Sequence, residues 1–419
     1  MNLGGGVHLT YCSNIHPGES WAEVRANVER HVLAVRQRVL PEGDFGVGLR
    51  LSARAAAELS APAALAEFRA FLARHRLYVF TLNGFPYGPF HGRRVKEGVY
   101  LPDWRDPERL RYTDQLADLL AALLPADPTM EGSVSTVPGA FKPALGGPGD
   151  VALIVEHLLR HVAHLVALRA RSGRLVTLAL EPEPHCFLET IDEVVGFFAR
   201  ELHGPAAVGR LMQLAALDRD AAARALHEHL GVCLDLCHAA VEFEDPAAGP
   251  RRLAEAGIRV LKMQISAGLR LPTLDAAALQ ALQRFDDPVY LHQVVQRGPG
   301  GLQRFADLPA ALAALQHSNA ALAALRHSNA ALAAPAAAAE GLEWRVHFHV
   351  PIFLERLAPF VSTQPFIREV LALHRARPLS SHLEVETYTW QVLPEAHRRG
   401  TVDEAVAREL DWVRTELAS

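Results

Sequence analysis

Gly231-Val-Cys-Leu-Asp-Leu-Cys-His-Ala239 is the segment that says most about the fold of this chain. Read as a strand, it places Cys233, Asp235 and Cys237 on one face and aliphatic side chains on the other. An acid on an otherwise apolar strand is costly to bury unless it is paired or bound to a metal. His238 follows where the strand ends, so it and Asp235 suit a divalent-metal site or an acid/base pair. A hydrogen-bonded core Asp beside a loop His is the plainer alternative.

Eight segments have the character of strands, and helical segments lie between them. The strands are expected at Val7–Cys12, Phe45–Leu51, Leu77–Asn83, Gly132–Val137, Leu175–Glu181, Gly231–Leu236, Arg259–Ile265 and Leu383–Tyr388. Three helices are expected to open with a capping box, at Ser20–Glu23, Thr190–Glu193 and Thr401–Glu404. This alternation predicts an α/β protein with a parallel (β/α)₈ TIM barrel, and a doubly wound open sheet is the second choice.

The two faces of each strand favour the barrel. One face of Leu175–Glu181 carries Thr177, Ala179 and Glu181, whereas the other is aliphatic. Arg259–Ile265 likewise sets Lys262 and Gln264 against an aliphatic face. A strand of a doubly wound sheet is covered by helices on both faces and should be apolar on both. We therefore expect residues 1–419 to form one closed TIM-barrel domain.

One region interrupts the pattern between the seventh and eighth strands, over about residues 288–355. Val289–Val295 and Trp344–Phe353 resemble strands and are expected to form an antiparallel excursion over the carboxyl-end mouth of the barrel. Between them, residues 310–339 hold a low-complexity repeat that begins Ala310-Ala-Leu-Ala-Ala-Leu-Gln-His-Ser-Asn319 and recurs at 320–329. Its alanines favour helix, and we exclude His317 and His327 as ligands because the duplication looks recent.

Composition narrows the class of protein. Lys and Arg number 42 against 47 Asp and Glu, a formal charge of −5, so no general basic field favours nucleic acid. The four cysteines, Cys12, Cys186, Cys233 and Cys237, match no disulfide or zinc spacing, which fits a reducing compartment. We see no signal peptide and no uninterrupted apolar run of about 18 residues. A cytoplasmic protein without a membrane span is expected.

Acids and imidazoles recur at the carboxyl ends of the expected strands, where barrel enzymes build their active sites. They are Glu181, Asp235, His238, Gln264, Glu384 and Glu386, and His347 and His349 share one face of the excursion strand. Four carboxylates from three neighbouring strands would repel one another strongly without a cation. The set predicts a site for Mn²⁺, Mg²⁺, Co²⁺ or Zn²⁺, and both histidines would shift the preference toward Zn²⁺ or Mn²⁺.

A second set of side chains is placed to contact a small substrate. His8 lies on the first strand, Asn83 ends the third, and His16, Tyr87 and His91 lie in loops expected above the mouth. Other aromatic residues of these loops, Trp21, Phe85, Tyr100 and Trp104, could line the same pocket. Aromatic side chains that only pack the loops together are an equally good explanation.

The order of the metal-end residues resembles the xylose-isomerase-like TIM barrels, which include sugar isomerases, ketose 3-epimerases and endonuclease IV. Their pattern is a Glu after the fifth strand, Asp-x-x-His after the sixth, a polar ligand after the seventh and a Glu on the eighth. Glu181, Asp235 with His238, Gln264 and Glu386 match in that order, and Glu386 is preferred to Glu384 because Glu386-Thr387 fits the family's final Glu-Thr. Gln264 departs from the usual His.

The run Glu181-Pro-Glu-Pro-His-Cys-Phe-Leu-Glu-Thr190 resembles the epimerase loop in which a second Glu contacts substrate. The resemblance therefore implies that Glu183 or Glu189 contacts the substrate. We expect these glutamates, Lys262 and His238 to be the candidates for acid/base catalysis and substrate contact. His347 and His349 fall where endonuclease IV has an Asp-x-His pair, and the sequence leaves open whether they bind metal or cover the substrate.

Three longer motifs resemble the EboE-type metabolite traffic proteins of bacteria over nearly the whole chain: His8–Trp21, Leu82–Gly92 and Trp344–Phe353. These proteins are encoded in clusters with a prenyltransferase and a dehydroquinate-synthase-like protein, so the resemblance implies contacts with other proteins of such a cluster. It implies no particular reaction and no oligomeric state.

We expect a one-metal isomerase or epimerase that acts on a small polyhydroxylated or cyclic metabolite. A metabolite-binding protein without catalysis is the first alternative. The second is a phosphodiesterase of endonuclease type, which would need several zinc ions and a basic groove.

Overall fold

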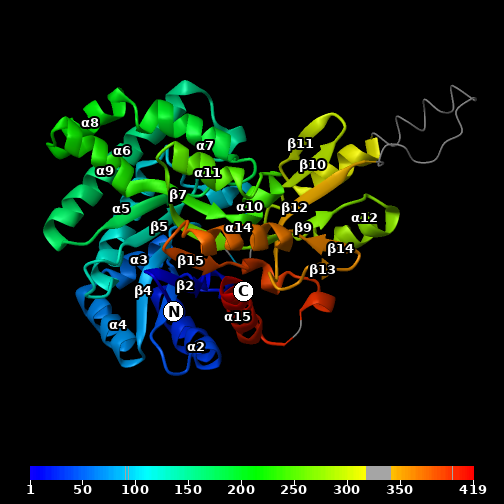
Figure 1. Ribbon diagram of the computed structural model, residues 1–419, viewed down its shortest axis with the longest axis horizontal. Coiled ribbons are helices and arrows are strands. Elements are labelled where there is room, and N and C mark those ends of the chain that lie inside the picture. The colour runs from blue at the N-terminus through cyan, green and yellow to red at the C-terminus, as the bar shows by residue number, and fades with distance from the viewer. Residues whose placement is uncertain (90, 93, 318–340, 399) are drawn as a thin grey trace, which may run out of the picture.

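The computed structural model describes residues 1–419 except 90, 93, 318–340 and 399, and its centre is a ring of eight parallel strands surrounded by helices (Figure 1). The strands are β2 Val7–Tyr11, β3 Phe45–Arg50, β4 Leu77–Asn83, β5 Gly132–Thr136, β6 Val176–Leu180, β7 Leu230–Asp235, β8 Arg259–Ile265 and β15 His382–Val385. They coincide with the eight predicted strands to within three residues at either end. A short strand, β1 (Asn2–Gly4), adds to β2 in antiparallel fashion.

The strand order closes on itself. The neighbours run from β3 through β8 in chain order, and β15 then pairs in parallel with both β8 and β2. A parallel bridge between Cys12 and Gly48 joins β2 to β3. Thr10 Oγ1 reinforces this seam by donating to Gly46 O (2.7 Å) and accepting from Gly48 N (3.0 Å). The predicted TIM barrel is confirmed, and the doubly wound sheet is excluded because an open sheet has no such closure.

The barrel interior contains a buried ion pair that is accommodated by small residues. Lys262 Nζ lies 2.6 Å from Glu384 Oε2, and neither side chain is exposed. Lys262 also donates to Ser135 Oγ across the barrel (3.2 Å). Gly48 leaves space for this pair, because a Cβ there would overlap the Glu384 carboxylate and lie 2.5 Å from Tyr11 O. The small, polar face that favoured a barrel therefore points inward.

Helices cover the outside of the ring. They are α1 Trp21–Asn27, α2 Leu33–Val39, α3 Ala53–Leu59, α4 Pro62–Arg74, α5 Pro107–Leu123, α6 Pro148–Ser172, α7 Ile191–Phe197, α8 Pro205–Ala215, α9 Arg219–His229, α10 Leu236–Val241, α11 Ala248–Glu255, α12 Ala276–Leu282, α14 Gln364–Ala376 and α15 Val402–Ala418. π-Helical turns η2 Val28–Val32 and η5 Phe198–Leu202 extend α1 and α7. The 3₁₀ turns are η1 Ser13–Ile15, η3 Lys96–Tyr100, η4 Lys142–Ala144, η6 Gln283–Phe285, η7 Tyr388–Gln391 and η8 Glu395–His397.

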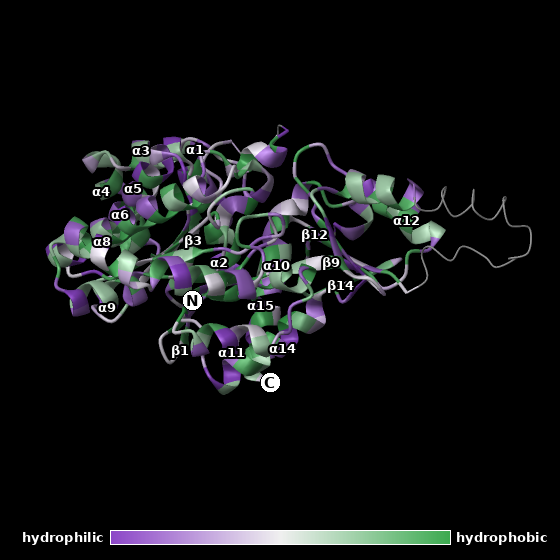
Figure 2. Ribbon diagram, turned by 90° about the horizontal axis from the view of Figure 1, so that it is seen from above, coloured by the Kyte–Doolittle hydropathy of each residue, from purple (hydrophilic) through white to green (hydrophobic). Residues whose placement is uncertain are grey.

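The helices begin as their sequences predict and are mixed in polarity. All three predicted capping boxes form, at the first turns of α1, α7 and α15. Figure 2 shows hydrophilic and hydrophobic residues alternating along α4, α5 and α6, as expected for helices with one buried side. By length and composition α6 could cross a membrane. This is weak evidence for a span, because α6 packs against α5 and α8 in the outer layer of the barrel.

A second sheet is inserted between β8 and β15 and projects to one side of the barrel (Figure 1). Its strands, in the order β11-β10-β12-β9-β14-β13, are all antiparallel: β9 Ala267–Leu271, β10 Val294–Gly298, β11 Gly301–Phe305, β12 Glu343–Val350, β13 Arg356–Leu357 and β14 Phe360–Ser362. The predicted antiparallel excursion is confirmed. It extends from Ala267 to Ser362, beyond the predicted 288–355, because β9 follows β8 almost without a break.

Two local predictions need correction. The strand β7 ends at Asp235, and Cys237 lies in the first turn of α10 because Asp235 caps that helix by accepting from His238 N. The predicted strand Val289–Val295 begins only at Val294, where pairing with β12 starts. Residues 308–317 of the repeat region are helical, whereas 318–340, with His327, lie outside the described residues. All four cysteines are free and buried.

Candidate metal centre

A cavity of about 50 Å³ lies at the carboxyl ends of the barrel strands. Its floor is made by Glu181, Glu183, His238 and Glu386, with His347 contributed by the inserted sheet. Its walls are mainly aromatic and aliphatic: Phe85, Pro86, Val95, Val99, Tyr100, Tyr290, Leu291 and Tyr388. The acids and histidines predicted at this end of the barrel are each at most 8% exposed. The space would hold a few water molecules.

Three carboxylates meet on the floor. One oxygen each of Glu181, Asp235 and Glu386 lies within 4.8 Å of the others. Asp235 Oδ1 accepts from His238 N and from Ser266 Oγ, both at 2.8 Å. Within the described part of the chain, the second oxygen of Asp235 and Oε2 of Glu181 have no hydrogen-bond partner. Buried carboxylate oxygens without a donor are the ligands that a cation would need.

Three histidines meet beside the carboxylates with a common orientation. Each donates Nδ1–H to an oxygen that can only accept: His238 to Pro182 O (2.9 Å), His347 to Gln293 Oε1 (2.7 Å) and His349 to Glu386 O (2.9 Å). Neutral rings held in this way carry a lone pair on Nε2.

The Nε2 atoms of two of these rings face one another. His238 Nε2 and His347 Nε2 are 3.1 Å apart. Nε2 of His349 has no partner among the described residues. Two nitrogen lone pairs at this distance repel unless a proton or a metal lies between or beside them. Metal-binding histidines have this arrangement, with the other ring nitrogen fixed by a carbonyl or carboxylate.

Overlapping groups of ligand atoms connect the two sets. Asp235 groups with His238 and His349, while His238 and His347 group with Glu183, each within 4.8 Å. Cys237 also groups with His347 and His349. The donor set therefore fits a divalent metal, with mixed nitrogen and oxygen ligands of the kind that Zn²⁺ and Mn²⁺ accept.

Burial and like charge shift the pKa values of these groups strongly. Burial, with the nearby carboxylates of Glu386 and Asp235, raises the pKa of Glu181 well above its usual range. Burial and Asp235 raise the pKa of Glu386 to about 8. Burial lowers the pKa of His349 to about 4 and, with His238 beside it, that of His347 well below its usual value. Protons or a cation must therefore offset the clustered negative charge.

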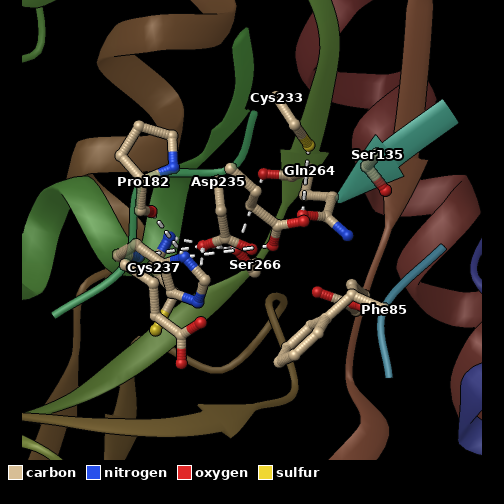
Figure 3. A network of polar contacts seen from close by, with 12 residues as sticks. Phe85, Ser135, Pro182, Cys233, Asp235, Cys237, Gln264 and Ser266 are labelled. Atoms are coloured by element: carbon tan, nitrogen blue, oxygen red, sulfur yellow. Dashed lines mark hydrogen bonds and ion pairs between the residues drawn. The ribbon is translucent and has the colours of Figure 1, made fainter. Parts of the chain in front are cut away.

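The structure brings Glu181, Asp235, Glu386, His347 and His349 together, as predicted for metal ligands, with His238 and Glu183 beside them. Gln264 lies next to Asp235 across the β7–β8 pair, as Figure 3 shows. Its Oε1 accepts from Cys233 Sγ (3.3 Å), and its amide nitrogen has no partner among the described residues. Gln264 does not line the cavity.

Two predicted catalytic groups lie elsewhere. Lys262 is paired with Glu384 beneath the cavity floor rather than in its lining. Glu189 accepts from His185 N (2.6 Å) and from Lys142 Nζ, outside the cavity. Strand alternation predicts which face a side chain occupies, but it does not predict how deep in the barrel that side chain lies.

The predicted substrate contacts divide in the same way. Asn83 lines the cavity and donates to Glu386 Oε1 (3.2 Å). His91 bonds Asn14 O (2.6 Å) and Tyr290 OH (2.8 Å), two cavity residues, so it supports the wall from outside. Tyr87 points to an outer groove and donates to Glu108 (2.8 Å). His8 lies near the start of β2, at the amino end of the barrel, and bonds Tyr78 OH (2.8 Å).

His16 belongs to a separate group with His31 and Asp403. Its ring stacks on that of His31, with centroids 4.1 Å apart and planes 8° from parallel. Imidazole lone pairs lie in the ring plane, so two parallel rings cannot both direct them at one ion. We therefore place no metal there.

Several site residues had no sequence signal of their own. Asn14 donates to Glu386 Oε1 (2.7 Å), Ser266 holds Asp235, and Gln293 holds His347. They come from the β2 loop, the end of β8 and the insertion, which only the fold brings together. Phe85 and Tyr100, which the sequence named as possible pocket aromatics, do line the cavity, whereas Trp104 is buried and donates to Thr136 Oγ1 (3.2 Å).

No protein-family model matches the chain, and no curated protein sequence matches it. Among solved structures it is similar to a D-psicose 3-epimerase with D-tagatose from Clostridium cellulolyticum H10, with 12% identity over 98% of this chain and 99% of that chain and a TM-score of 0.47. It is also similar to the probable 3-DHS dehydratase AsbF from Bacillus anthracis (12% identity, 97% and 98% covered, TM-score 0.44) and to the IOLI protein with a zinc atom (12% identity, 99% and 98% covered, TM-score 0.44). At these identities and TM-scores, the barrel assignment rests on the strand order described above.

Proposed function

We propose that this chain is a divalent-metal-dependent isomerase or epimerase that acts on a small polyhydroxylated or cyclic metabolite. The observation that carries the proposal is the set of buried acceptors around Asp235 and His238. His238 Nε2 and His347 Nε2 lie 3.1 Å apart, a spacing that calls for a shared proton or a metal ion, and carboxylate oxygens beside them lack donors among the described residues. This arrangement is stable when a cation lies among the acceptors. The imidazole and carboxylate donors favour Zn²⁺ or Mn²⁺, with Co²⁺ and Mg²⁺ as the other candidates.

Glu183 is the proposed acid/base group. Tyr100 OH donates to its Oε1 (2.6 Å), and its carboxyl group lines the cavity. When bound, the metal would polarise a carbonyl/hydroxyl pair of the substrate and so acidify the hydrogen on the adjacent carbon. Glu183 would take that proton. In an isomerisation it would return the proton to the former carbonyl carbon while the hydroxyl proton passes to the former carbonyl oxygen; in an epimerisation a second acid would reprotonate the same carbon from its opposite face. Lys262 and Glu189 are left out of this role because each is held by an ion pair outside the cavity.

The size of the cavity limits the substrate. About 50 Å³ is too little for a sugar, so entry requires part of the wall to move. We propose η3 as the moving part, because Lys96 at its start lines the cavity; its 2.7 Å ion pair with Asp307 of the insertion would have to open. Lys96 is the one cation in the lining that the described residues supply, which disfavours the phosphodiesterase alternative.

A relationship to EboE-type metabolite traffic proteins also remains a proposal, together with a cytoplasmic location and contacts with proteins of the same gene cluster. It is supported by the motifs themselves. Trp344–Phe353 contains His347 and His349, and Leu82–Gly92 contains Asn83 and Phe85. A binding protein without catalysis would keep the pocket, so the test must separate binding from turnover.

The test combines metal content with hydrogen exchange. Purified protein is incubated with Mn²⁺ or Zn²⁺, and bound metal is counted by mass spectrometry in the wild type and in Glu181→Ala and Asp235→Asn. Ketohexoses and cyclic polyols are then incubated with the loaded protein in D₂O and followed by NMR for deuterium at carbon. We expect about one metal per chain, lost in both variants, and exchange with at least one substrate.

Glu183→Gln and Glu189→Gln form the matched pair. The first should retain metal and lose exchange, whereas the second should retain both because Glu189 lies outside the cavity. Metal binding without exchange would favour the binding protein, and two or three zinc ions would favour the phosphodiesterase. No metal at any concentration would refute the proposed chemistry.

A further inference from the structure

The insertion contributes a buried amide that is bonded to His347 from two sides. Gln293 immediately precedes β10 and is not exposed. Its backbone oxygen accepts from His347 N (2.8 Å), and its Oε1 accepts from His347 Nδ1 (2.7 Å). His347 is therefore held along both its backbone and its ring by one residue.

The orientation of the Gln293 amide is determined by its other contacts. Its NH₂ group faces three acceptors: Tyr100 OH (2.8 Å), Pro184 O (3.1 Å) and Glu183 Oε1 (3.3 Å). The Tyr100 hydroxyl donates its hydrogen to Glu183, so its oxygen acts as the acceptor for the Gln293 amide. A flipped amide would set its oxygen against these acceptors and its NH₂ against the ring of His347. The oxygen must therefore face Nδ1 of His347.

This orientation decides where the proton of His347 resides. An amide oxygen can only accept, so Nδ1 carries the hydrogen and Nε2 carries the lone pair. That Nε2 lies 3.1 Å from the Nε2 of His238, at the candidate metal centre. Without the Gln293 oxygen, His347 can adopt the tautomer with its hydrogen on Nε2. That Nε2–H could donate to His238, and His347 would then have no lone pair to offer a metal.

We propose that Gln293 is a positioning residue that holds His347 in the tautomer and orientation of a metal ligand. The inference rests on the proposed metal centre and deepens it. Because Gln293 also bonds Tyr100, Pro184 and Glu183, it joins the insertion to the loops after β4 and β6. The insertion thus does more than cover the mouth, since it supplies both a ligand and the group that orients it.

The experiment compares Gln293→Met, which removes the acceptor, with Gln293→Glu, which keeps it. Gln296→Met is the control. The Gln296 side chain also accepts from a ring nitrogen, Nε1 of Trp344 (2.8 Å), and Trp344 lies on β12 with His347 but away from the site. Zn²⁺ affinity is measured by competition with a chromophoric chelator, and the melting temperature of the metal-free protein checks folding.

We expect Gln293→Met to weaken Zn²⁺ binding about 10- to 100-fold, the usual loss for a group that orients a histidine ligand. Gln293→Glu should stay within about threefold of the wild type, and Gln296→Met should bind as the wild type does. The order of the Zn²⁺ affinities separates positioning from stability. Gln293→Glu places a buried carboxylate beside Glu183, so it should lower stability more than Gln293→Met does, yet it should bind Zn²⁺ more tightly. If affinity merely followed stability, Gln293→Glu would be the weaker binder, and the proposal would be wrong.

Two further measurements separate positioning from packing. Adding Gln293→Met to His347→Ala should cause no loss of affinity beyond His347→Ala alone, because the amide acts through that ring. Long-range ¹H–¹⁵N NMR of ¹⁵N-histidine protein without metal should show His347 protonated at Nδ1 in the wild type and altered in Gln293→Met. Unchanged affinity in Gln293→Met would overturn this inference alone, whereas a wild type that binds no Zn²⁺ would overturn the metal centre with it.

Discussion

Replacing Lys262 by Met should destabilise the barrel without removing its metal. The Lys262 ammonium lies 2.6 Å from Glu384 Oε2, and both side chains are fully buried. Removing one partner of a buried ion pair leaves the other uncompensated and costs about 3–5 kcal/mol. At about 2.1 cal/mol/K per residue, a chain of 419 residues has an unfolding entropy near 0.9 kcal/mol/K. The melting temperature should therefore fall by about 3–6 °C.

The double variant Lys262→Met/Glu384→Gln is the matched control. It removes both charges, so it should recover most of the loss seen in the single variant. Thermal unfolding of metal-free protein measures both, and mass spectrometry counts the Zn²⁺ that each retains. A single variant that melts within 1 °C of the wild type would refute the ion-pair reasoning. Loss of metal or of hydrogen exchange in an otherwise stable double variant would instead return Lys262 to the catalytic role that its sequence position suggested.

Three other outcomes follow from individual residues. Gly48→Ala should lower the free energy of unfolding in urea by about 1–3 kcal/mol, because its Cβ would overlap Glu384. The control is Gly209→Ala, a helical site with nothing within 4 Å, which should be neutral or stabilising by up to about 1 kcal/mol. Equal effects of the two substitutions would contradict the packed interior. His382 is buried with its pKa lowered to about 3, chiefly by desolvation. Between pH 6.5 and that value the unfolded chain binds more protons, so wild-type stability should fall on acidification by up to about 1.4 kcal/mol per pH unit from this group. His382→Gln should show a shallower slope in metal-free unfolding at several pH values, and an unchanged slope would show that His382 is protonated when folded. Finally, 100-fold excess Zn²⁺ over its dissociation constant should stabilise the wild type by about 2.7 kcal/mol and leave Asp235→Asn nearly unaffected; equal shifts in calorimetry would place the binding elsewhere.

Periodicity predicted the barrel well because burial acts on each strand separately. Thr177, Ala179 and Glu181 alternate with aliphatic residues since one face of β6 meets the outer helices and the other meets the interior. The capping box at Thr190 was equally readable because its donors and acceptors lie within four residues. Asp235 and His238 were found because an acid interrupts an apolar strand and a histidine follows at its end, although the sequence did not show that the acid also caps α10.

Depth in the barrel could not be predicted in this way. His8 and Asn83 were both predicted to contact substrate, yet His8 is near the start of its strand and Asn83 at the end of its own. Glu183 and Glu189 lie in one loop, and only the path of that loop points the first at the cavity and the second at Lys142.

Local periodicity and capping patterns were enough to predict the eight strands, the barrel class and the strand ends at which acids and histidines gather. The tertiary structure alone decided which of those side chains meet. The 3.1 Å contact joins His238 on α10 to His347, 109 residues away in the insertion, and Gln293 reaches His347 across an antiparallel pairing. Distances between segments so far apart in the chain depend on how the whole barrel closes and how the inserted sheet packs over it, and no local pattern encodes that.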